Sequence, residues 1–215
     1  MSDPRYTPLR ERHEALGASF TDFGGWQMPV RYTSDLAEHH AVRQAAGIFD
    51  ISHMAEFLVT GDFAGEFLDY SLAGRLSAMP VGKAKYSLML ADDGGIIDDV
   101  IVYRLADDRF LVIANAGNRG FVDSAFASRV RSFPSRIERE RAPLAAGEDR
   151  TFEGFLGDRG VDVEDVSDEY ALLAVQGPAS EAIVSSTAGI TDLSTPWVEH
   201  CLLYTSDAAD EGLGV

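Results

Sequence analysis

Hydrophobic periodicity of 3.6 residues predicts a helix in each of two segments of the first half of the chain. The first is 35–46, where Ser34 or Asp35 can cap the helix, Glu38 follows Asp35 at capping-box spacing, and Gly47 can end it. Its apolar stripe is modest, so we expect it to pack along one side only. The second is 62–72, with three aromatic side chains on one face: Phe63, Phe67 and Tyr70.

A period of two predicts strands in the middle of the chain. Three of them follow one another at 86–90, 96–105 and 109–115, separated by the turn sequence DDGG and by a second turn at 106–108. We expect an antiparallel meander here, and further extended chain at 48–60, interrupted by polar residues 50–53. The segment 119–150 has a weaker pattern and is left open between a helix end and a solvated loop.

Near the end of the chain, 170–175 reads as a strand, followed by a helix with Pro178 in its first turn and Gly189 beyond its end. Strands and helices therefore come in segregated runs. This arrangement favours an α+β fold of antiparallel sheets with flanking helices over a doubly wound parallel sheet.

Composition narrows the possible partners. The 215 residues are 46% hydrophobic, enough for a sizeable core, and the formal net charge is −17. Such acidity disfavours nucleic acid and anionic lipid as partners through simple repulsion. No apolar run approaches the roughly 20 residues of a membrane helix, and the N-terminal segment has no signal-peptide pattern, so we expect a cytoplasmic protein without a membrane partner.

The single cysteine excludes an internal disulfide and lies in an unusual run. Cys201 to Glu211 reads CLLYTSDAADE, which is one reading frame of a transposon-end adapter used in DNA library preparation. We therefore expect 201–215 to be a non-native tail and the natural sequence to stop near His200.

The most informative chemistry lies in the segment GGIIDDVIVY. Alternation along a strand puts Ile97, Asp99, Ile101 and Tyr103 on one face, and Asp98, Val100 and Val102 on the other. The face of Asp99 is apolar and aromatic, where a carboxylate needs hydrogen-bond donors, and ligand nitrogens are one source of them. A pair of aspartates that merely ends a hairpin is the equally weighted alternative.

Two more side chains can converge with this carboxylate across neighbouring strands. Tyr86 lies on the strand before, and Asn115 ends the strand after. A phenol, an amide and a carboxylate together suit a flat heterocycle with donors and acceptors, although each alone is more often a core or turn residue.

Other kinds of site are disfavoured by spacing. Asp50, Ser52 and His53 cannot converge as a hydrolase triad because they follow one another in extended chain, so a structural role is favoured for Ser52 and His53. His39 and His40 point in different directions on a helix, and no metal-ligand or nucleotide-loop spacing is present. We therefore expect no metal.

Six segments occur in a fixed order and together resemble one family. They are TPLRERHEALGASFTDFGGWQMPVRY, EHHAVRQAAGIFDISHM, GKAKYSLML, DDGGIIDDVIVYRL, VIANAGN and YALLAVQGP. The family that they resemble is the T protein of the glycine cleavage system, an aminomethyltransferase that uses tetrahydrofolate. The resemblance covers most of 6–118 and resumes at about 161–186.

The resemblance implies a reaction and its residues. Asp99 is the family's essential carboxylate, and the implied folate contacts are Tyr86, Ile101, Tyr103, Asn115 and Met54. The implied reaction transfers the methylene of an aminomethyl group from the lipoyl arm of the H protein to tetrahydrofolate and releases ammonia. Related alternatives are a folate-dependent demethylase of an N-methyl or S-methyl compound and a non-catalytic folate-binding assembly factor.

The resemblance also implies a domain plan. We expect a first domain from 1–57 and 156–200, a second domain at 58–155 that carries the meander, and truncation before the family's C-terminal barrel domain. Because the folate lies where the family's three domains meet, we expect this chain alone to be inactive. The stretch 131–160 is longer and more charged than expected and reads as an insertion or a sequence error.

Overall fold

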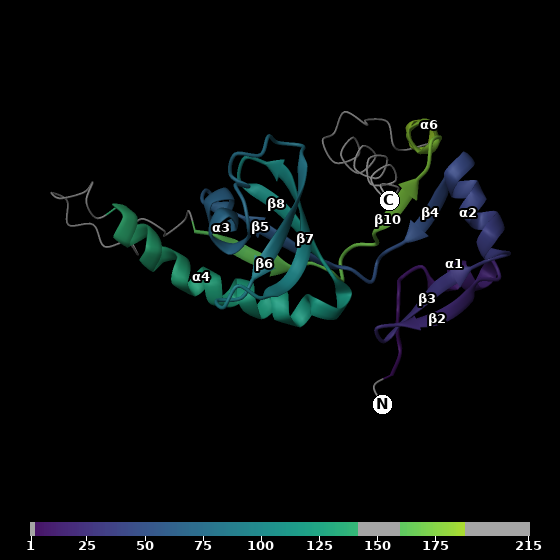
Figure 1. Ribbon diagram of the computed structural model, residues 1–215, viewed down its shortest axis with the longest axis horizontal. Helices are drawn as coiled ribbons and strands as arrows, with labels where there is room; N and C mark the ends of the chain where they lie inside the picture. The colour runs from purple at the N-terminus through teal and green to yellow at the C-terminus, as the bar shows by residue number, and fades with distance from the viewer. Residues whose placement is uncertain (1–2, 142–159, 188–215) are drawn as a thin grey trace. The chain divides into compact units, whose positions relative to one another are not determined.

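The computed structural model describes residues 3–141 and 160–187 in two compact units, with side chains described for 3–133 and 160–187 (Figure 1). One unit contains 3–54 and 167–187, and the other contains 55–166. Both are antiparallel sheets with flanking helices, which confirms the α+β class. The predicted tail at 201–215 and residues 142–159 of the predicted insertion lie outside the described residues.

The unit 55–166 is built on a five-stranded sheet with the order β6-β7-β8-β5-β9. Its strands are β5 (Ala55–Thr60), β6 (Ala84–Leu90), β7 (Ile96–Ala106), β8 (Arg109–Ala114) and β9 (Asp162–Asp165). Every neighbouring pair is antiparallel, so the predicted meander is confirmed. The DDGG turn closes where the Ala91 amide donates to the Gly95 carbonyl at 2.7 Å, with Gly94 at a φ of 86°.

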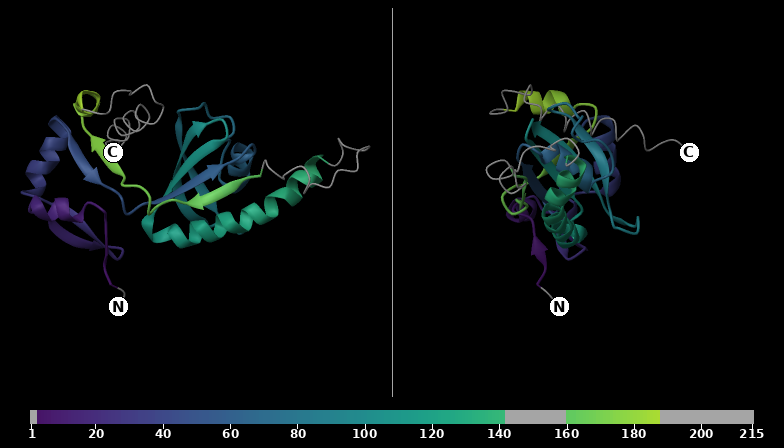
Figure 2. Two further views of the ribbon diagram at one scale, coloured as in Figure 1. Left: turned by 180° about the vertical axis from the view of Figure 1, so that it is seen from behind. Right: turned by 90° about the vertical axis from the view of Figure 1, so that its left-hand side faces the viewer.

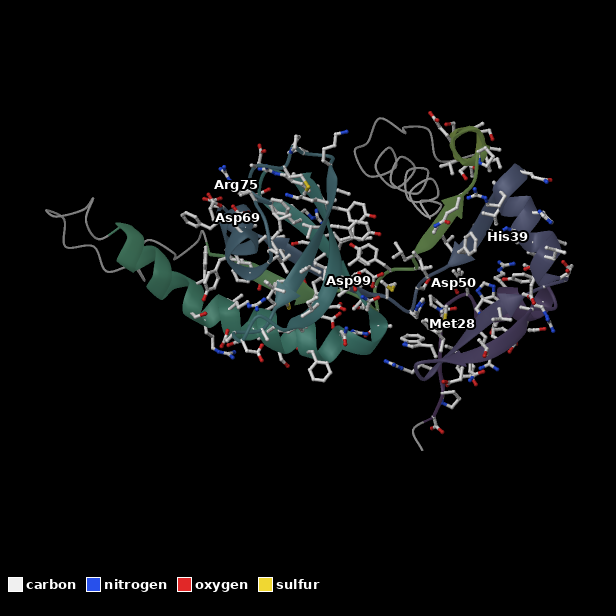
Figure 3. The ribbon with its side chains drawn as sticks, in the orientation of Figure 1. Met28, His39, Asp50, Asp69, Arg75 and Asp99 are labelled. Carbon is white, nitrogen blue, oxygen red and sulfur yellow. The ribbon has the colours of Figure 1, made fainter. Side chains whose placement is uncertain are left out.

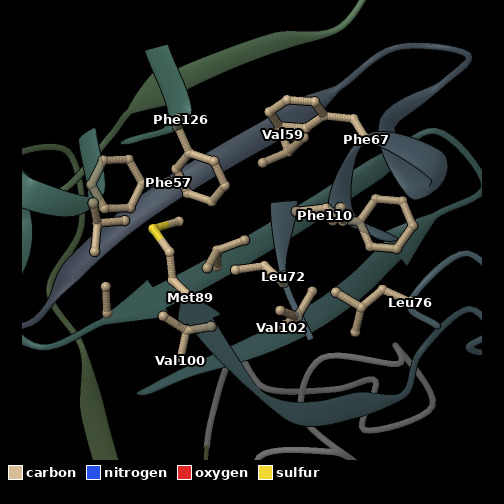
Figure 4. Close-up of a cluster of buried hydrophobic side chains, with 14 of the residues drawn as sticks. Phe57, Val59, Phe67, Leu72, Leu76, Met89, Val100, Val102, Phe110 and Phe126 are labelled. Atoms are coloured by element: carbon tan, nitrogen blue, oxygen red, sulfur yellow. The ribbon is translucent and has the colours of Figure 1, made fainter. Parts of the chain in front are cut away.

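Two helices provide the core of this unit. They are α3 (Ala64–Ser71) and α4 (Arg119–Arg141), and the short 3-10 turn η1 (Ala116–Asn118) leads from β8 into α4. Figure 2 shows α4 running along the strands from two directions. The core is rich in phenylalanine: the Phe126 ring lies 5.6 Å from that of Phe57 and 6.0 Å from that of Phe67 (Figure 4). Phe67 of the predicted aromatic face is fully buried, which confirms the inward side of α3.

The helix α4 fills the segment that the sequence left unassigned. Its core-facing positions are Val122, Phe126, Val130 and Phe133, which recur at helical spacing. The Arg-rich and Glu-rich second half, with Pro134 inside it, hides this stripe because polar residues dominate the average. The prediction of a possible loop is therefore corrected to a long helix.

The other unit has two small sheets. One is β1 (Arg5–Tyr6), β3 (Trp26–Arg31) and β2 (Ser19–Phe23) in that order, and the other pairs β4 (Gly47–Asp50) with β10 (Leu173–Gln176). Its helices are α1 (Arg10–Ala15), α2 (Asp35–Gln44) and α6 (Ser180–Ser186). The β4–β10 ladder joins distant parts of the chain, with Gly47 opposite Gln176.

The ends of α2 show how local chemistry sets its limits. Ser34 is the N-cap, and its hydroxyl accepts the Ala37 amide at 3.4 Å. Glu38 reaches back beyond the cap and accepts the Thr33 amide at 2.6 Å, so Asp35 is not the cap. The helix ends at Gln44, and Gly47 opens β4 instead of ending the helix, which corrects that prediction.

Three other predicted boundaries shift slightly. Pro178 stands just before the N-cap of α6 and not in its first turn. The units divide at 54/55 and 166/167, whereas the predicted divisions were 57/58 and 155/156. The reason is strand pairing, because the whole of β5 pairs with β8, and β9 adds to the free side of β5.

Candidate functional site

The candidate site lies on the face of the five-stranded sheet opposite its phenylalanine core. Strand register places Tyr86 of β6 opposite Ile101 of β7, and Ile101 opposite Ile113 of β8. One step along, Leu88 lies opposite Asp99, which Figure 3 marks on β7. Directly opposed residues share a face, so these side chains form a small grid.

Burial along β7 confirms the predicted alternation from Asp98 onward. Asp98, Val100 and Val102 are buried, while Asp99 is exposed and Ile101 is half-buried. Ile97 is the exception, because it packs against the hydrophobic core instead of sharing the face of Asp99. A register irregularity between Met89 and Leu90 shifts the pairing there and ends the simple alternation.

The buried carboxylate is therefore Asp98, not Asp99. Asp98 is 2% exposed and accepts three hydrogen bonds: from the Asn115 backbone amide at 2.8 Å, from Asn115 Nδ2 at 3.0 Å and from Asn118 Nδ2 at 2.6 Å. These bonds supply the donors that a buried carboxylate requires. The expectation that Asp99 needs this compensation is corrected, since Asp99 lies on the open face.

Asn115 links the two carboxylates. Its Nδ2 donates to Asp99 Oδ1 at 3.0 Å and to the Asp99 carbonyl oxygen at 3.2 Å, in addition to its bond with Asp98. The predicted convergence of an amide with the carboxylate of β7 is thus present. Two members of the cluster, Asp98 and Asn118, were missed, although the proximity of Asn118 to Asn115 in VIANAGN was a visible signal.

Aromatic and apolar side chains line the rest of this face. Tyr86 is 55% exposed and Tyr103 is 9% exposed, and Tyr103 lies opposite Ala84 at the next step of the grid. The row of Tyr86, Ile101 and Ile113 continues onto β5 at Glu56, a carboxylate that is 1% exposed. Glu56 is a further acidic residue of this face that the sequence pattern did not single out.

Met54, the remaining predicted folate contact, belongs to the other unit. Its amide donates to the Ile51 carbonyl at 3.0 Å in the turn before β5. Its assignment to the site stays a prediction.

The polar residues of IFDISHM serve the structure of the first unit. Asp50 accepts Thr7 Oγ1 at 2.5 Å and contacts His13 Nε2 at 2.8 Å, and the other His13 ring nitrogen meets the Tyr32 hydroxyl at 2.7 Å. Burial alone would raise the pKa of Asp50, but hydrogen bonds from Thr7, Ser52 and His13 hold that pKa below its ordinary value. The side chain of Asp50 thus ties the N-terminal segment to β4.

Ser52 and His53 do not form a hydrolase triad with Asp50. The Ser52 hydroxyl accepts the Leu172 amide at 2.9 Å, which fastens the turn to the chain entering β10. The His53 ring packs edge-on against Phe23 at 5.5 Å, and burial lowers the pKa of His53. The structural role expected for both residues is confirmed.

Within 3–141 and 160–187, no group of three or more His, Cys, Asp or Glu side chains is arranged to hold a metal ion. In the same ranges, no helix combines the length and apolarity needed to cross a bilayer.

The fold and the site define an α+β protein whose antiparallel sheet displays a carboxylate–amide cluster beside aromatic side chains. Residues 9–206 match the family described as the GCVT N-terminal domain, and the chain belongs to that family.

Named relatives agree with this family. The chain is 46% identical over 209 residues to an aminomethyltransferase of Saccharopolyspora erythraea, covering 97% of this chain and 49% of that protein. It is 48% identical over 184 residues to one of Cutibacterium acnes, covering 86% and 43%. The chain therefore spans about half the length of the curated relatives it matches.

A solved structure also resembles this one. The crystal structure of glycine cleavage system aminomethyltransferase T from Bartonella henselae superposes with a TM-score of 0.67 at 35% identity. The match covers 84% of this chain and 43% of that chain.

Proposed function

We propose that this chain carries the folate-binding face of an aminomethyltransferase of the glycine cleavage system. The reaction moves the methylene of an aminomethyl group, carried on the lipoyl arm of the H protein, to tetrahydrofolate, with release of ammonia. Relatives that carry the name aminomethyltransferase support the activity. The observation that carries the proposal is an exposed Asp99 carboxylate, held by Asn115 on a sheet face beside Tyr86.

The chemistry of this face fits tetrahydrofolate. A reduced pterin is a flat heterocycle with several N–H donors along its edge, and Asp99 offers a carboxylate that can accept them. The exposed ring of Tyr86 and the side chain of Ile101 offer apolar contact for the faces of such a ring. Tyr103 lies further along the same side of β7 and extends this wall.

The roles of the residues follow from their positions. Tetrahydrofolate supplies the nucleophilic nitrogen that accepts the methylene. Asp99 accepts hydrogen bonds from the ring nitrogens, which orients them and makes them more nucleophilic, and it can hold a proton that leaves them. Asn115 fixes the Asp99 carboxylate, while Tyr86, Ile101 and Tyr103, with Met54 as a further contact, keep water from the aminomethyl carbon.

The test is Asp99→Asn in a protein of the relatives' full length that carries these residues. We expect the rate of transfer to fall by roughly 10²-fold or more, because the amide keeps the shape but loses the charge and the base. Asp92→Asn is the matched control: it makes the same change at an exposed residue of the hairpin turn, and its activity should stay within about twofold of the parent. Transfer by Asp99→Asn within a few-fold of the parent would refute the assignment.

Two other functions share the folate face, namely demethylation of an N-methyl or S-methyl compound and folate binding without turnover. No observation of this structure favours either one. The names of the relatives favour aminomethyl transfer.

A further inference from the structure

We propose that Asp98 is a positioning residue that sets the hydrogen-bonding polarity of the site. It holds the Asn115 amide with its nitrogen toward the carboxylates, which leaves the amide oxygen to accept an N–H from the ligand. The identity of the ligand, tetrahydrofolate, rests on the proposed function above, whereas the orientation of the amide rests on the structure alone.

The orientation of Asn115 follows from its partners. Its Nδ2 lies 3.0 Å from Asp98 Oδ1 and 3.0 Å from Asp99 Oδ1. Carboxylate oxygens are acceptors, so each contact needs a hydrogen from the amide, and the two N–H groups of Asn115 are both used. The reversed orientation would set the amide oxygen against two carboxylate oxygens and is excluded by repulsion.

Asp98 is the member of the pair that is fixed in place. It lies on the buried side of β7, and its two oxygens are anchored by the Asn115 backbone amide and by Asn118 Nδ2. Asp99 is exposed and has rotational freedom that Asp98 lacks. Because a buried charge retains its donors, Asp98 holds one amide hydrogen of Asn115 whether or not a ligand is present.

The consequence is selectivity by polarity. With its nitrogen committed, Asn115 presents only an oxygen, and the neighbouring Asp99 also presents oxygens. The two residues therefore form an acceptor pair that favours a ligand edge rich in N–H groups and disfavours one that presents carbonyl oxygens.

The first test is a double-mutant cycle on the dissociation constant for tetrahydrofolate, with Asp98→Asn, Asn115→Ala and the two combined. Asp98→Asn is isosteric but adds a donor facing Asn115, so the amide turns over and affinity should fall about tenfold. In the Asn115→Ala background, Asp98→Asn should cause no further loss. Asp123→Asn, the same change at an exposed residue of α4, should leave the affinity unchanged. An equal loss from Asp98→Asn in both backgrounds would overturn the proposal.

The second test needs no variant that can unfold. Asn115 and Asn118 are the only asparagines in the sequence, so asparagine-selective isotope labelling gives two side-chain amides to follow by NMR. In the parent, tetrahydrofolate should shift the Asn115 carbonyl carbon while both of its amide hydrogens keep slow exchange with water. A ligand that contacts those hydrogens instead would overturn the proposal.

The two proposals fail in different ways. If the parent does not bind tetrahydrofolate, the proposed function fails, while slow exchange of the Asn115 amide hydrogens in the ligand-free parent still supports the role of Asp98. If the parent binds tetrahydrofolate and those hydrogens exchange freely, the role of Asp98 fails alone.

Discussion

Replacing Phe126 with alanine tests whether α4 holds the sheet together as the structure indicates. Phe126 is 1% exposed and packs between the rings of Phe57 and Phe67. Burying about 200 Å² of phenylalanine at about 25 cal/mol per Å² gives an upper estimate of about 5 kcal/mol. Truncations of this kind cost about 3–5 kcal/mol, so a loss near 3 or 4 kcal/mol is expected.

The assay is urea unfolding followed by circular dichroism. With a slope of about 1–3 kcal/mol per molar urea, the midpoint should fall by about 1.5 M or more, with the slope unchanged. Phe121→Ala is the matched control, because Phe121 lies on the same helix and is 69% exposed; its midpoint should barely move. A loss below about 1 kcal/mol for Phe126→Ala, or equal losses for the two variants, would refute the described packing of α4.

Two further predictions concern the unit that contains β4 and β10. Gly177 has a φ of +124° and an added Cβ would lie 2.5 Å from the Val42 carbonyl oxygen, so Gly177→Ala should cost at least about 3 kcal/mol. Gly17→Ala, with a φ of +77° and open space around the added carbon, should cost only about 1 kcal/mol in the same thermal melt; equal costs would contradict the close approach at Gly177. Burial lowers the pKa of His53 from 6.5, so the unfolded chain binds this proton more tightly and stability should fall as pH drops below about 6.5. A His53→Phe variant should lose that part of the pH dependence in urea titrations at a series of pH values, and an unchanged dependence would contradict the burial of the ring.

The meander and its faces were within reach of sequence reasoning because period-two patterning and the DDGG turn are local signals. Opposed strands then place Tyr86, Ile101 and Asp99 together without further information. Asn115 comes to Asp99 for the same reason, since a tight turn fixes the register between β7 and β8.

The division of roles between the two aspartates was not within reach of the sequence. Alternation separates Asp98 from Asp99, but it does not say which face packs against helices. That depends on α4, whose apolar stripe is hidden among charged residues, and on η1, which brings Asn118 to Asp98. Ile97 was misplaced for a related reason, because one register irregularity reverses the side on which a residue points.

The β4–β10 ladder has a consequence for the order in which the chain can fold. Strand β4 leaves the ribosome early, but its partner β10 follows only after the whole of 55–166 has been made. The unit 55–166 is contiguous and can form as soon as it emerges, whereas the unit around it must wait and then close a long loop. During synthesis, β4 therefore presents an unsatisfied edge for the time needed to translate an entire unit, which makes the nascent chain most exposed to mispairing at Gly47–Asp50.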